Sequence, residues 1–325
     1  MCTGLSMLNG KFYFGRNLDL DWDFGQQVVI TPRKYPFVFT KEPPQNNHFA
    51  LIGMANVTEN YPLYAEAINE KGLGMAGLYF AASGHYPSGA PDAKYQVSPY
   101  ELIPWVLGQC DTLKKARELL ENLALNAIPF SRHMPLTLLH WIISDKTGTL
   151  VAEPIQTGFR VYENPVGVLT NEPPFEFHMT NLHNYINLTR EYAKNRFSDK
   201  IELVSLGTGM GSIGLPGDPS SVSRFVRAAF NKWNGICEKE ESSSVSQFFH
   251  ILDSVSVVSG TLLTRDRQVY FTRYSCCMNG DDGVYYYKTY QNNQITAVHL
   301  FNEDLEARTL KTFPLITQEQ IRRVN

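Results

Sequence analysis

The sequence predicts an α+β domain in which two antiparallel sheets are covered by paired helices. Short apolar and aromatic runs, bounded by turn residues, predict three groups of strands. Two helical patterns lie between the first and second groups, and two more between the second and third. The strict alternation of strand and helix that a doubly wound parallel sheet requires is missing. We find no Pro/Gly/Ser-rich linker, low-complexity tract or internal repeat, so residues 1–325 are expected to form a single domain.

The first half of the chain begins with strands and then becomes helical. Apolar runs predict strands over residues 11–16, 28–31, 49–55 and 73–80. Ser98-Pro99-Tyr100-Glu101 has the pattern of a capping box with proline at the first helical position, and predicts a helix to about Gly108. Asp111 or Thr112 is expected to cap a second helix over residues 113–123, where apolar residues have helical spacing.

The second half repeats this order. Strands are predicted over residues 138–144, 149–153, 159–162 and 166–170. Two helices follow, over residues 220–233 after Pro219 and over residues 245–255. The last strands are predicted over residues 269–274, 284–290 and 295–300.

Composition excludes several classes of function. The 325 residues are 43% hydrophobic and 19% charged, which is typical of a globular chain with a large core. The net charge of -3 and the lack of a basic run argue against nucleic-acid binding. No stretch resembles a membrane span, and the N-terminal residues lack the charged and apolar regions of a secretory signal. We therefore expect a cytoplasmic protein without a membrane partner.

Cysteine usage agrees with a reducing compartment. The five cysteines are an odd number, and none has the C-x-x-C spacing of a zinc ribbon or a thioredoxin-like site. Cys2 has a special position, because removal of Met1 would leave it with a thiol and a free α-amine on the same residue. The amine has an ordinary pKa of about 8 and can act as the base for its own nucleophile. Taken alone, a cysteine at position 2 is more often an ordinary residue.

Three other motifs are weaker. Residues 209–214 match G-x-G-x-x-G, but the Leu-Pro-Gly-Asp-Pro run that follows breaks the helix that a dinucleotide site needs, and a pocket-shaping loop is the better interpretation. His178 and His183 lie five residues apart, so surface or core histidines are favoured over a metal site. No G-x-S-x-G elbow of a serine hydrolase occurs.

Gly15-Arg16-Asn17-Leu18-Asp19 follows the aromatic run Phe12-Tyr13-Phe14 of the first predicted strand. If Cys2 heads the neighbouring strand, a tight return would bring Arg16 and Asp19 close to it. A nearby cation stabilises a thiolate, and an anion holds a terminal ammonium. On these residues alone, a surface turn with an ion pair is the simpler interpretation.

Several long motifs in order make the chain similar to the choloylglycine hydrolase family of N-terminal nucleophile (Ntn) amidohydrolases, which contains bile salt hydrolases and penicillin V acylases. The matching segments are MCTG at residues 1–4, FGRNLD at 14–19, INEKGLGMAGL at 68–78, NPVGVLTNEPPF at 164–175, IGLPGDPSSVSRF at 213–225, SQFFHIL at 246–252 and YYYKTYQNNQITAV at 285–298. The resemblance covers essentially the whole chain. It implies a four-layer αββα fold with two antiparallel sheets between helix layers.

The resemblance also implies roles for individual residues. Cys2 would be the nucleophile once Met1 is removed, with its α-amine as the base. Arg16 would lie beside the thiolate and Asp19 would orient the amine. Asn171 would help to form the oxyanion hole, and Arg224 would support the charges around the thiol. No cofactor or metal is implied, and homotetramers are usual in the family.

Tyr79 departs from the bile salt hydrolase pattern, which has asparagine at this position, and resembles the penicillin V acylase pattern. A tyrosine reaches an oxyanion through its hydroxyl or backbone N–H, and its ring can stack on an aromatic acyl group. The remaining motifs favour hydrolysis of conjugated bile salts, with release of glycine or taurine. The alternatives are penicillin V acylase as the main activity, a thiol enzyme that uses an internal cysteine, and a non-catalytic small-molecule binder.

A conjugated bile salt combines an apolar steroid with an anionic tail, so its pocket should be apolar with a cationic edge. The candidate wall residues are Leu20, Trp22, Phe24, Tyr61, Phe130 and Leu136. For each of them, an ordinary place in the core is an equally good interpretation.

Overall fold

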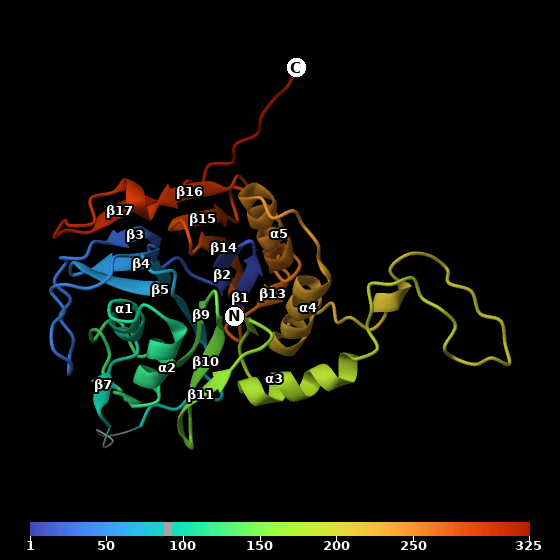
Figure 1. The fold of residues 1–325 in the computed structure, drawn as a ribbon, viewed down its shortest axis with the longest axis horizontal. Coiled ribbons are helices and arrows are strands. Elements are labelled where there is room, and N and C mark those ends of the chain that lie inside the picture. The colour runs from blue at the N-terminus through green and yellow to red at the C-terminus, as the bar shows by residue number, and fades with distance from the viewer. Residues whose placement is uncertain (88–92) are drawn as a thin grey trace.

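A seven-stranded antiparallel sheet carries the N-terminus of the chain (Figure 1). The computed structural model describes residues 1–87 and 93–325. In spatial order the strands of this sheet are β12 (Val168–Leu169), β1 (Cys2–Asn9), β2 (Lys11–Leu20), β14 (Val269–Asn279), β15 (Val284–Thr289) and β16 (Thr296–His299), and β13 (Leu262–Leu263) pairs with β14. Strand β1 therefore lies between β12 and β2.

A second, eight-stranded antiparallel sheet packs against the first. Its strands are, in order, β11 (Gly158–Glu163), β10 (Gly148–Ile155), β9 (Leu139–Asp145), β6 (Gly74–Tyr79), β5 (Tyr61–Asn69), β4 (Leu51–Thr58), β3 (Gln27–Thr31) and β17 (Lys311–Pro314). Strands β1 and β2 contact β6 across the interface between the sheets. A short parallel pair, β7 (Tyr95–Val97) and β8 (Leu123–Leu125), lies outside both sheets.

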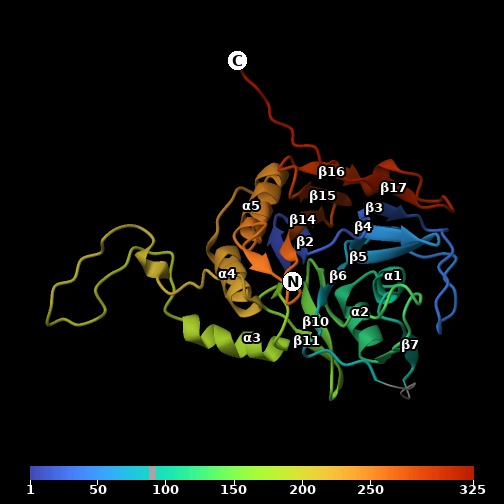
Figure 2. The same ribbon diagram turned by 180° about the vertical axis from the view of Figure 1, so that it is seen from behind.

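Helices cover the outer faces of the two sheets, as Figure 2 shows from behind. Helices α1 (Leu102–Leu107) and α2 (Leu113–Leu120) pack on the eight-stranded sheet. Helices α4 (Ser221–Asn234) and α5 (Glu241–Asp253) pack on the seven-stranded sheet, and α3 (Phe175–Asn181) lies beside α4. The order is therefore helix, sheet, sheet, helix, and the predicted αββα architecture is confirmed.

The β1–β2 hairpin differs in detail from the sequence prediction. The chain reverses at Gly10, which has a φ of +73°, and β2 then runs unbroken from Lys11 to Leu20. Residues 15–19 are thus part of a strand and not a tight return. Gly15 is required there because a Cβ would lie 2.0 Å from the carbonyl oxygen of Cys276 on β14. Arg16 and Asp19 still come close to Cys2, because the hairpin pairs Cys2 with Leu18.

Other element boundaries shift for local reasons. Helix α1 begins at Leu102 and not at Pro99. The capping box is only half formed: the Glu101 carboxylate accepts the Ser98 N–H at 3.0 Å, but the Ser98 hydroxyl has no partner among the described residues. Thr112 caps α2 as predicted, through Lys115 N. Strand β12 has two residues in place of the predicted five, because the Asn164 side chain accepts the N–H groups of Val166 and Gly167 and forms a turn. The prediction gave no range for α3 or for the strands β1, β5, β7, β8, β13 and β17.

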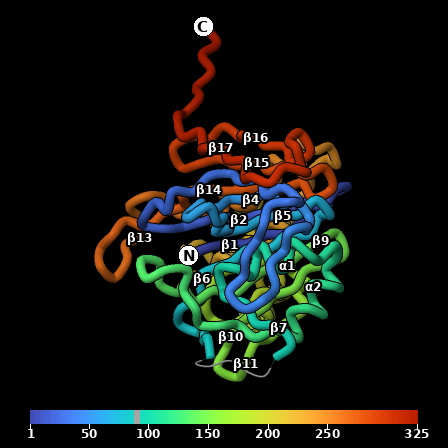
Figure 3. Tube along the Cα trace, turned by 90° about the vertical axis from the view of Figure 1, so that its left-hand side faces the viewer, coloured from blue at the N-terminus to red at the C-terminus, as the bar shows by residue number. Residues whose placement is uncertain are grey.

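The segment between α3 and α4 forms an arm that extends from the body in Figures 1 and 2. It follows the 3-10 helix η1 (Leu182–Tyr185) and includes η2 (Met210–Ser212). The G-x-G-x-x-G motif lies on this arm, where Gly209 and Gly214 have positive φ and a Cβ on either would meet no atom within 4 Å. The 3-10 helix η3 (Leu300–Asn302) lies between β16 and β17, and the C-terminal segment after β17 also leads away from the body (Figure 3). Within residues 1–87 and 93–325, no helix has the length and apolar character that a membrane span requires.

Candidate active site

Cys2 is the first residue of β1 and is buried between the two sheets. Its strand partner is Leu18, and two residues further along the hairpin Gly4 pairs with Arg16. Residues that pair directly, and those two positions away on either strand, share one face of a sheet. Cys2, Arg16 and Leu18 therefore point to the same side, toward β6 of the facing sheet.

Arg16 reaches across the sheet interface and is held by backbone carbonyls of the opposite sheet. Its Nη1 donates to the carbonyl oxygens of Gly77 at 2.5 Å and Ala65 at 3.2 Å. Burial lowers the pKa of this guanidinium, but the neighbouring Cys2 and Glu66 raise it, and the net pKa lies above its ordinary value. Arg16 is thus a permanent positive charge fixed beside Cys2.

Glu66, in the middle of β5, is the counter-charge of Arg16. Its carboxylate lies 3.7 Å from Arg16 Nη1 and accepts hydrogen bonds from Tyr285 Oη at 2.6 Å and Tyr274 Oη at 2.8 Å. Burial raises the pKa of Glu66, and Arg16 and the two tyrosines oppose this shift. The sequence analysis missed Glu66, because a single charged residue interrupts the apolar pattern of its strand.

Asn171 and Arg224 hold the backbone on both sides of Cys2. The Cys2 N–H donates to Asn171 Oδ1 at 2.9 Å. Arg224, from the first turn of α4, donates from Nη1 to the Cys2 carbonyl oxygen at 2.5 Å and from Nη2 to Asn171 Oδ1 at 2.6 Å. Burial lowers the pKa of Arg224, while Asp19 and Cys2 oppose this effect. The three residues predicted from distant motifs therefore meet at one point.

Tyr79, the last residue of β6, contacts this group through its backbone. Asn171 Nδ2 donates to the Tyr79 carbonyl oxygen at 2.8 Å. An asparagine amide has two N–H groups, so this bond uses one of them. The Tyr79 side chain is 47% exposed. The backbone of Tyr79 thus fixes the amide, while its ring lies at the surface.

Asp19 is fully buried on the helix-facing side of β2. Its Oδ1 accepts a hydrogen bond from Thr272 Oγ1 at 2.6 Å, whereas Oδ2 has no partner among the described residues. Met1 precedes Cys2 in the structure, and its ammonium donates to the Asp19 backbone carbonyl at 3.1 Å. Asp19 is therefore the acidic residue beside the start of β1.

The structure separates the predicted wall residues into two groups. Leu20 and Phe24 pack against the core that contains Cys2, and the Trp22 ring lies 6.0 Å from that of Phe24. Tyr61 and Leu136 pack against the other core, on the helix side of the eight-stranded sheet, and Phe130 contacts Tyr61. Two cavities, of about 350 and 260 Å³, open beside β14 and β15 and include none of these six residues. The wall assignment stays a prediction.

Histidine positions agree with the sequence interpretation. His178 is fully buried in α3, and His183 is exposed on η1. In the part of the chain that the structure describes, no three His, Cys, Asp or Glu side chains are grouped in a way that could hold a metal ion. His178 nevertheless contacts the Asn171 carbonyl, His140 contacts that of the preceding Thr170, and Glu153 contacts His140. None of the three was assigned to the site from the sequence.

The four-layer αββα fold is that of the Ntn class of hydrolases, and the structure places a buried cysteine at the head of β1, next to an arginine and an asparagine. Residues 2–313 match the model of the family described as linear amide C-N hydrolases, choloylglycine hydrolase family. The chain belongs to this family, and it is a hydrolase of carbon–nitrogen bonds in linear amides.

Three similar proteins illustrate the relationship. The chain is 46% identical over its full length, and over all of that protein, to a bile salt hydrolase/transferase of Lactiplantibacillus plantarum. A solved conjugated bile acid hydrolase variant from Clostridium perfringens has a TM-score of 0.93 at 36% identity, with complete coverage of both chains. A penicillin V acylase from Agrobacterium tumefaciens shares the fold, with a TM-score of 0.74 at 18% identity over 98% of this chain and 92% of that one.

Proposed function

We propose that the chain, after removal of Met1, is a cysteine hydrolase that cleaves conjugated bile salts into a bile acid and glycine or taurine. The observation that carries this proposal is the arrangement around Cys2, whose backbone N–H and carbonyl are held by Asn171 and Arg224. Removal of Met1 turns that backbone nitrogen into a free amine next to the thiol. The nucleophile and its base then belong to one residue.

The reaction proceeds in two steps. The Cys2 thiol gives its proton to the α-amine, and the sulfur attacks the amide carbonyl carbon to form a tetrahedral oxyanion. The ammonium then protonates the leaving nitrogen, the C–N bond breaks, and a thioester with Cys2 remains. In the second step the amine takes a proton from water and the hydroxide attacks the thioester carbon. The C–S bond then breaks, the bile acid leaves, and the sulfur takes the proton back from the ammonium, which regenerates the thiol.

Arg16 and Asp19 supply the charges for these steps. The fixed positive charge of Arg16 lies beside Cys2, where it can stabilise the negative charge on the sulfur during the attack. Asp19 Oδ2, which no other described residue contacts through a hydrogen bond, is a buried acceptor beside the start of β1 and suits a terminal ammonium. Burial lowers the pKa of the Met1 ammonium that now occupies this region, and the same environment would make the Cys2 amine a base near neutral pH.

Asn171 and Tyr79 are the proposed oxyanion donors. The remaining N–H of Asn171 Nδ2 and the backbone N–H of Tyr79 are the groups that we assign to the developing negative charge. Preorganised donors of this kind are each worth on the order of a hundredfold in rate. The bond from Asn171 to the Tyr79 carbonyl supports this assignment, because it holds the two donors together.

Similarity favours bile salts over penicillin V. The Lactiplantibacillus plantarum and Clostridium perfringens relatives carry bile salt or conjugated bile acid names, and both align over the whole chain. The penicillin V acylase of Agrobacterium tumefaciens shares only the fold. Penicillin V acylase activity is the second candidate, because Tyr79 presents a half-exposed ring that can stack on a phenoxyacetyl group.

A substrate panel tests this proposal. The processed enzyme is incubated with glycocholate, taurocholate and penicillin V, and kcat/KM is measured for each. We expect the two bile salts to be the better substrates. A higher kcat/KM for penicillin V would contradict the proposal and favour the second candidate.

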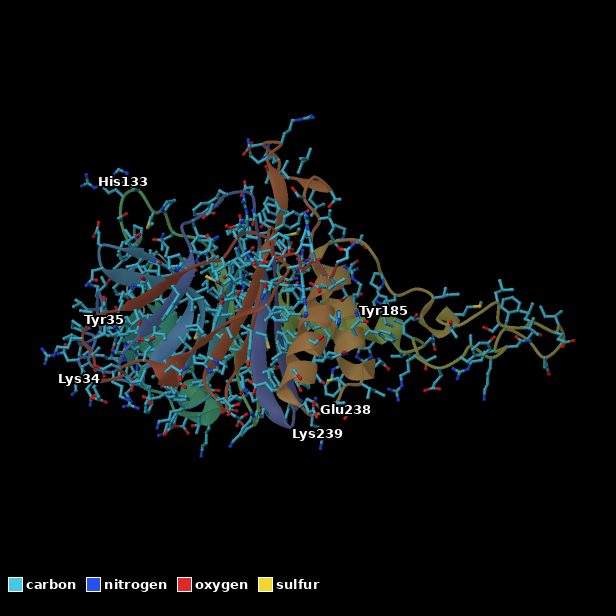
Figure 4. All side chains as sticks on the ribbon, turned by 90° about the horizontal axis from the view of Figure 1, so that it is seen from above. Lys34, Tyr35, His133, Tyr185, Glu238 and Lys239 are labelled. Carbon is cyan, nitrogen blue, oxygen red and sulfur yellow. The ribbon has the colours of Figure 1, made fainter. Side chains whose placement is uncertain are left out.

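We further propose that the enzyme is a homotetramer in the cytoplasm and that residues 1–325 fold as one domain. The arm supports the assembly, because its side chains beyond Tyr185 stand apart from the body (Figure 4) and several of them are large and apolar. Ile186, Phe197, Val204, Leu206 and Ile213 are each at least 70% exposed. Such surface is usually covered by a partner, here a second copy of the chain. Light scattering of the purified enzyme tests the tetramer.

A further inference from the structure

The Thr170–Asn171 segment is held by two buried histidines. Beyond β12 the chain leaves the sheet, so the carbonyls of these residues have no strand partner and need other donors. His140 Nε2 lies 3.0 Å from the Thr170 carbonyl oxygen, and His178 Nε2 lies 3.0 Å from the Asn171 carbonyl oxygen. A carbonyl oxygen only accepts hydrogen bonds, so both Nε2 atoms carry a proton.

His140 is part of a buried pair with Glu153. His140 lies on β9 and Glu153 on β10, both fully buried, and His140 Nδ1 is 2.8 Å from Glu153 Oε1. This contact is a hydrogen bond between the imidazole and the carboxylate. The Phe80 ring stacks on the imidazole at 4.2 Å between centroids, which limits its rotation. Phe80 directly follows Tyr79, the other proposed oxyanion donor.

His178 reaches Asn171 from α3. Its ring stacks on Phe225 of α4 at 4.7 Å between centroids. Burial lowers the pKa of His178 to about 4, so the ring is neutral near pH 7. Its Nδ1 has no partner among the described residues, which agrees with a neutral ring protonated at Nε2.

Glu153 connects the two histidines. Besides His140, its carboxylate accepts the backbone N–H of Phe175 at 3.1 and 3.2 Å. Phe175 begins α3, the helix that carries His178. One buried carboxylate therefore sets the position of the first histidine directly and of the second through the start of its helix.

We propose that His140, His178 and Glu153 are positioning residues that hold the Asn171 amide where the oxyanion develops. This inference rests on the proposed function, in which Asn171 is an oxyanion donor. The three residues contact no reacting atom. They act through the backbone of residues 170–171, and a displacement of about 1 Å in such a group can lower the rate by on the order of a hundredfold.

Two reactions of Cys2 separate this role from general structural support. Amide hydrolysis needs the thiolate and the oxyanion donors, whereas alkylation by iodoacetamide needs the thiolate but forms no oxyanion. His178→Phe keeps the ring stacked on Phe225 and removes the donor. His178→Gln places an amide N–H near the former Nε2. His183→Phe, on the exposed η1, is the matched control.

For His178→Phe we expect kcat to fall about tenfold to a hundredfold, with KM within about twofold of the parent value. The rate at which iodoacetamide alkylates Cys2 should stay at the parent value. His178→Gln should recover most of the turnover, and His183→Phe should match the parent. Glu153→Gln gives a second test if His178→Phe does not fold, with the same split expected between the two reactions.

If His178→Phe and Glu153→Gln both keep the kcat of the parent, the inference is overturned. It is also overturned if hydrolysis and alkylation of Cys2 fall in equal proportion in these two variants. Failure of the proposed function has a different signature. In that case the parent enzyme itself would not hydrolyse glycocholate, taurocholate or penicillin V through Cys2, whatever residue occupies position 178.

Discussion

The backbone nitrogen of Cys2 donates to the side-chain oxygen of Asn171 at 2.9 Å, although the two residues are 169 positions apart. The same oxygen accepts a hydrogen bond from Arg224 at 2.6 Å. In the processed enzyme this contact would orient the α-amine of the nucleophile and the amide of an oxyanion donor at once. The proposed base and one proposed oxyanion donor are thus connected through Asn171 Oδ1.

Arg224→Gln should reduce both activity and stability. The substitution removes the guanidinium donors from the Cys2 carbonyl and Thr3 Oγ1, both of which are buried, and leaves Asn171 Oδ1 with the Cys2 N–H alone. We expect unfolding to become easier by about 2–4 kcal/mol and kcat to fall at least tenfold. Urea unfolding and initial rates check this prediction. Arg227→Gln on the same helix, whose contacts are to backbone carbonyls away from Cys2, is the control, and equal losses in the two variants would contradict the role of Arg224.

Tyr79→Asn should change substrate preference without changing stability. The contact with Asn171 uses the Tyr79 carbonyl, which the substitution keeps, and the side chain is half exposed. We expect the free energy of unfolding to stay within about 0.5 kcal/mol of the parent. The ratio of kcat/KM for penicillin V to that for glycocholate should fall about tenfold, because the stacking ring is lost. An unchanged ratio would show that the ring does not contact the acyl group.

Trp22→Ala should weaken binding of bile salts. Trp22 is 58% exposed in the loop after β2, beside Phe24, and an apolar steroid would cover it. We expect KM for glycocholate to rise about tenfold with little change in kcat. Trp233 on α4 is 64% exposed and is a matched control. If Trp22→Ala and Trp233→Ala have the same KM as the parent, Trp22 is not a wall of the pocket.

His178 should make the protein less stable in mild acid. Its folded pKa of about 4 is below the ordinary value of 6.5, so between these values the unfolded chain binds the proton and the folded chain does not. Stability should therefore fall by up to about 1.4 kcal/mol per pH unit from this group as the pH drops from about 6.5 to 4. Urea unfolding at several pH values measures the slope. His178→Gln should have a shallower slope, and an unchanged slope would contradict the assignment.

The sequence predicts the residues around Cys2 better than the buried residues that hold them in place. Cys2, Arg16, Asn171 and Arg224 lie in long motifs, so their meeting could be expected before the structure was known. Glu66, by contrast, is an isolated charge within an apolar strand, and its partners Tyr274 and Tyr285 come from the facing sheet. Which side chains meet across two sheets depends on how the sheets pack, and no spacing along the chain reports this.

Contacts from distant parts of the chain also explain why β5 and α3 were not predicted. Strand β5 was missed because Glu66 and the partly exposed residues of its first half break the apolar pattern. Helix α3 has seven residues and no side-chain cap, so it has no start signal in the sequence, and Glu153 takes the place of a cap from another strand. Helices α2 and α4 have Thr112 and Ser220 as their caps, and both were predicted close to their observed bounds.

The most direct test of the account is mass spectrometry of the enzyme quenched during turnover of glycocholate. We predict an N-terminal peptide that begins at Cys2, lacks Met1 and carries the choloyl group as a thioester. The peptides that contain Cys110, Cys237, Cys276 and Cys277 should be unmodified. An active enzyme that retains Met1, or an acyl group on one of those internal cysteines, would contradict the assignment of Cys2 as an N-terminal nucleophile.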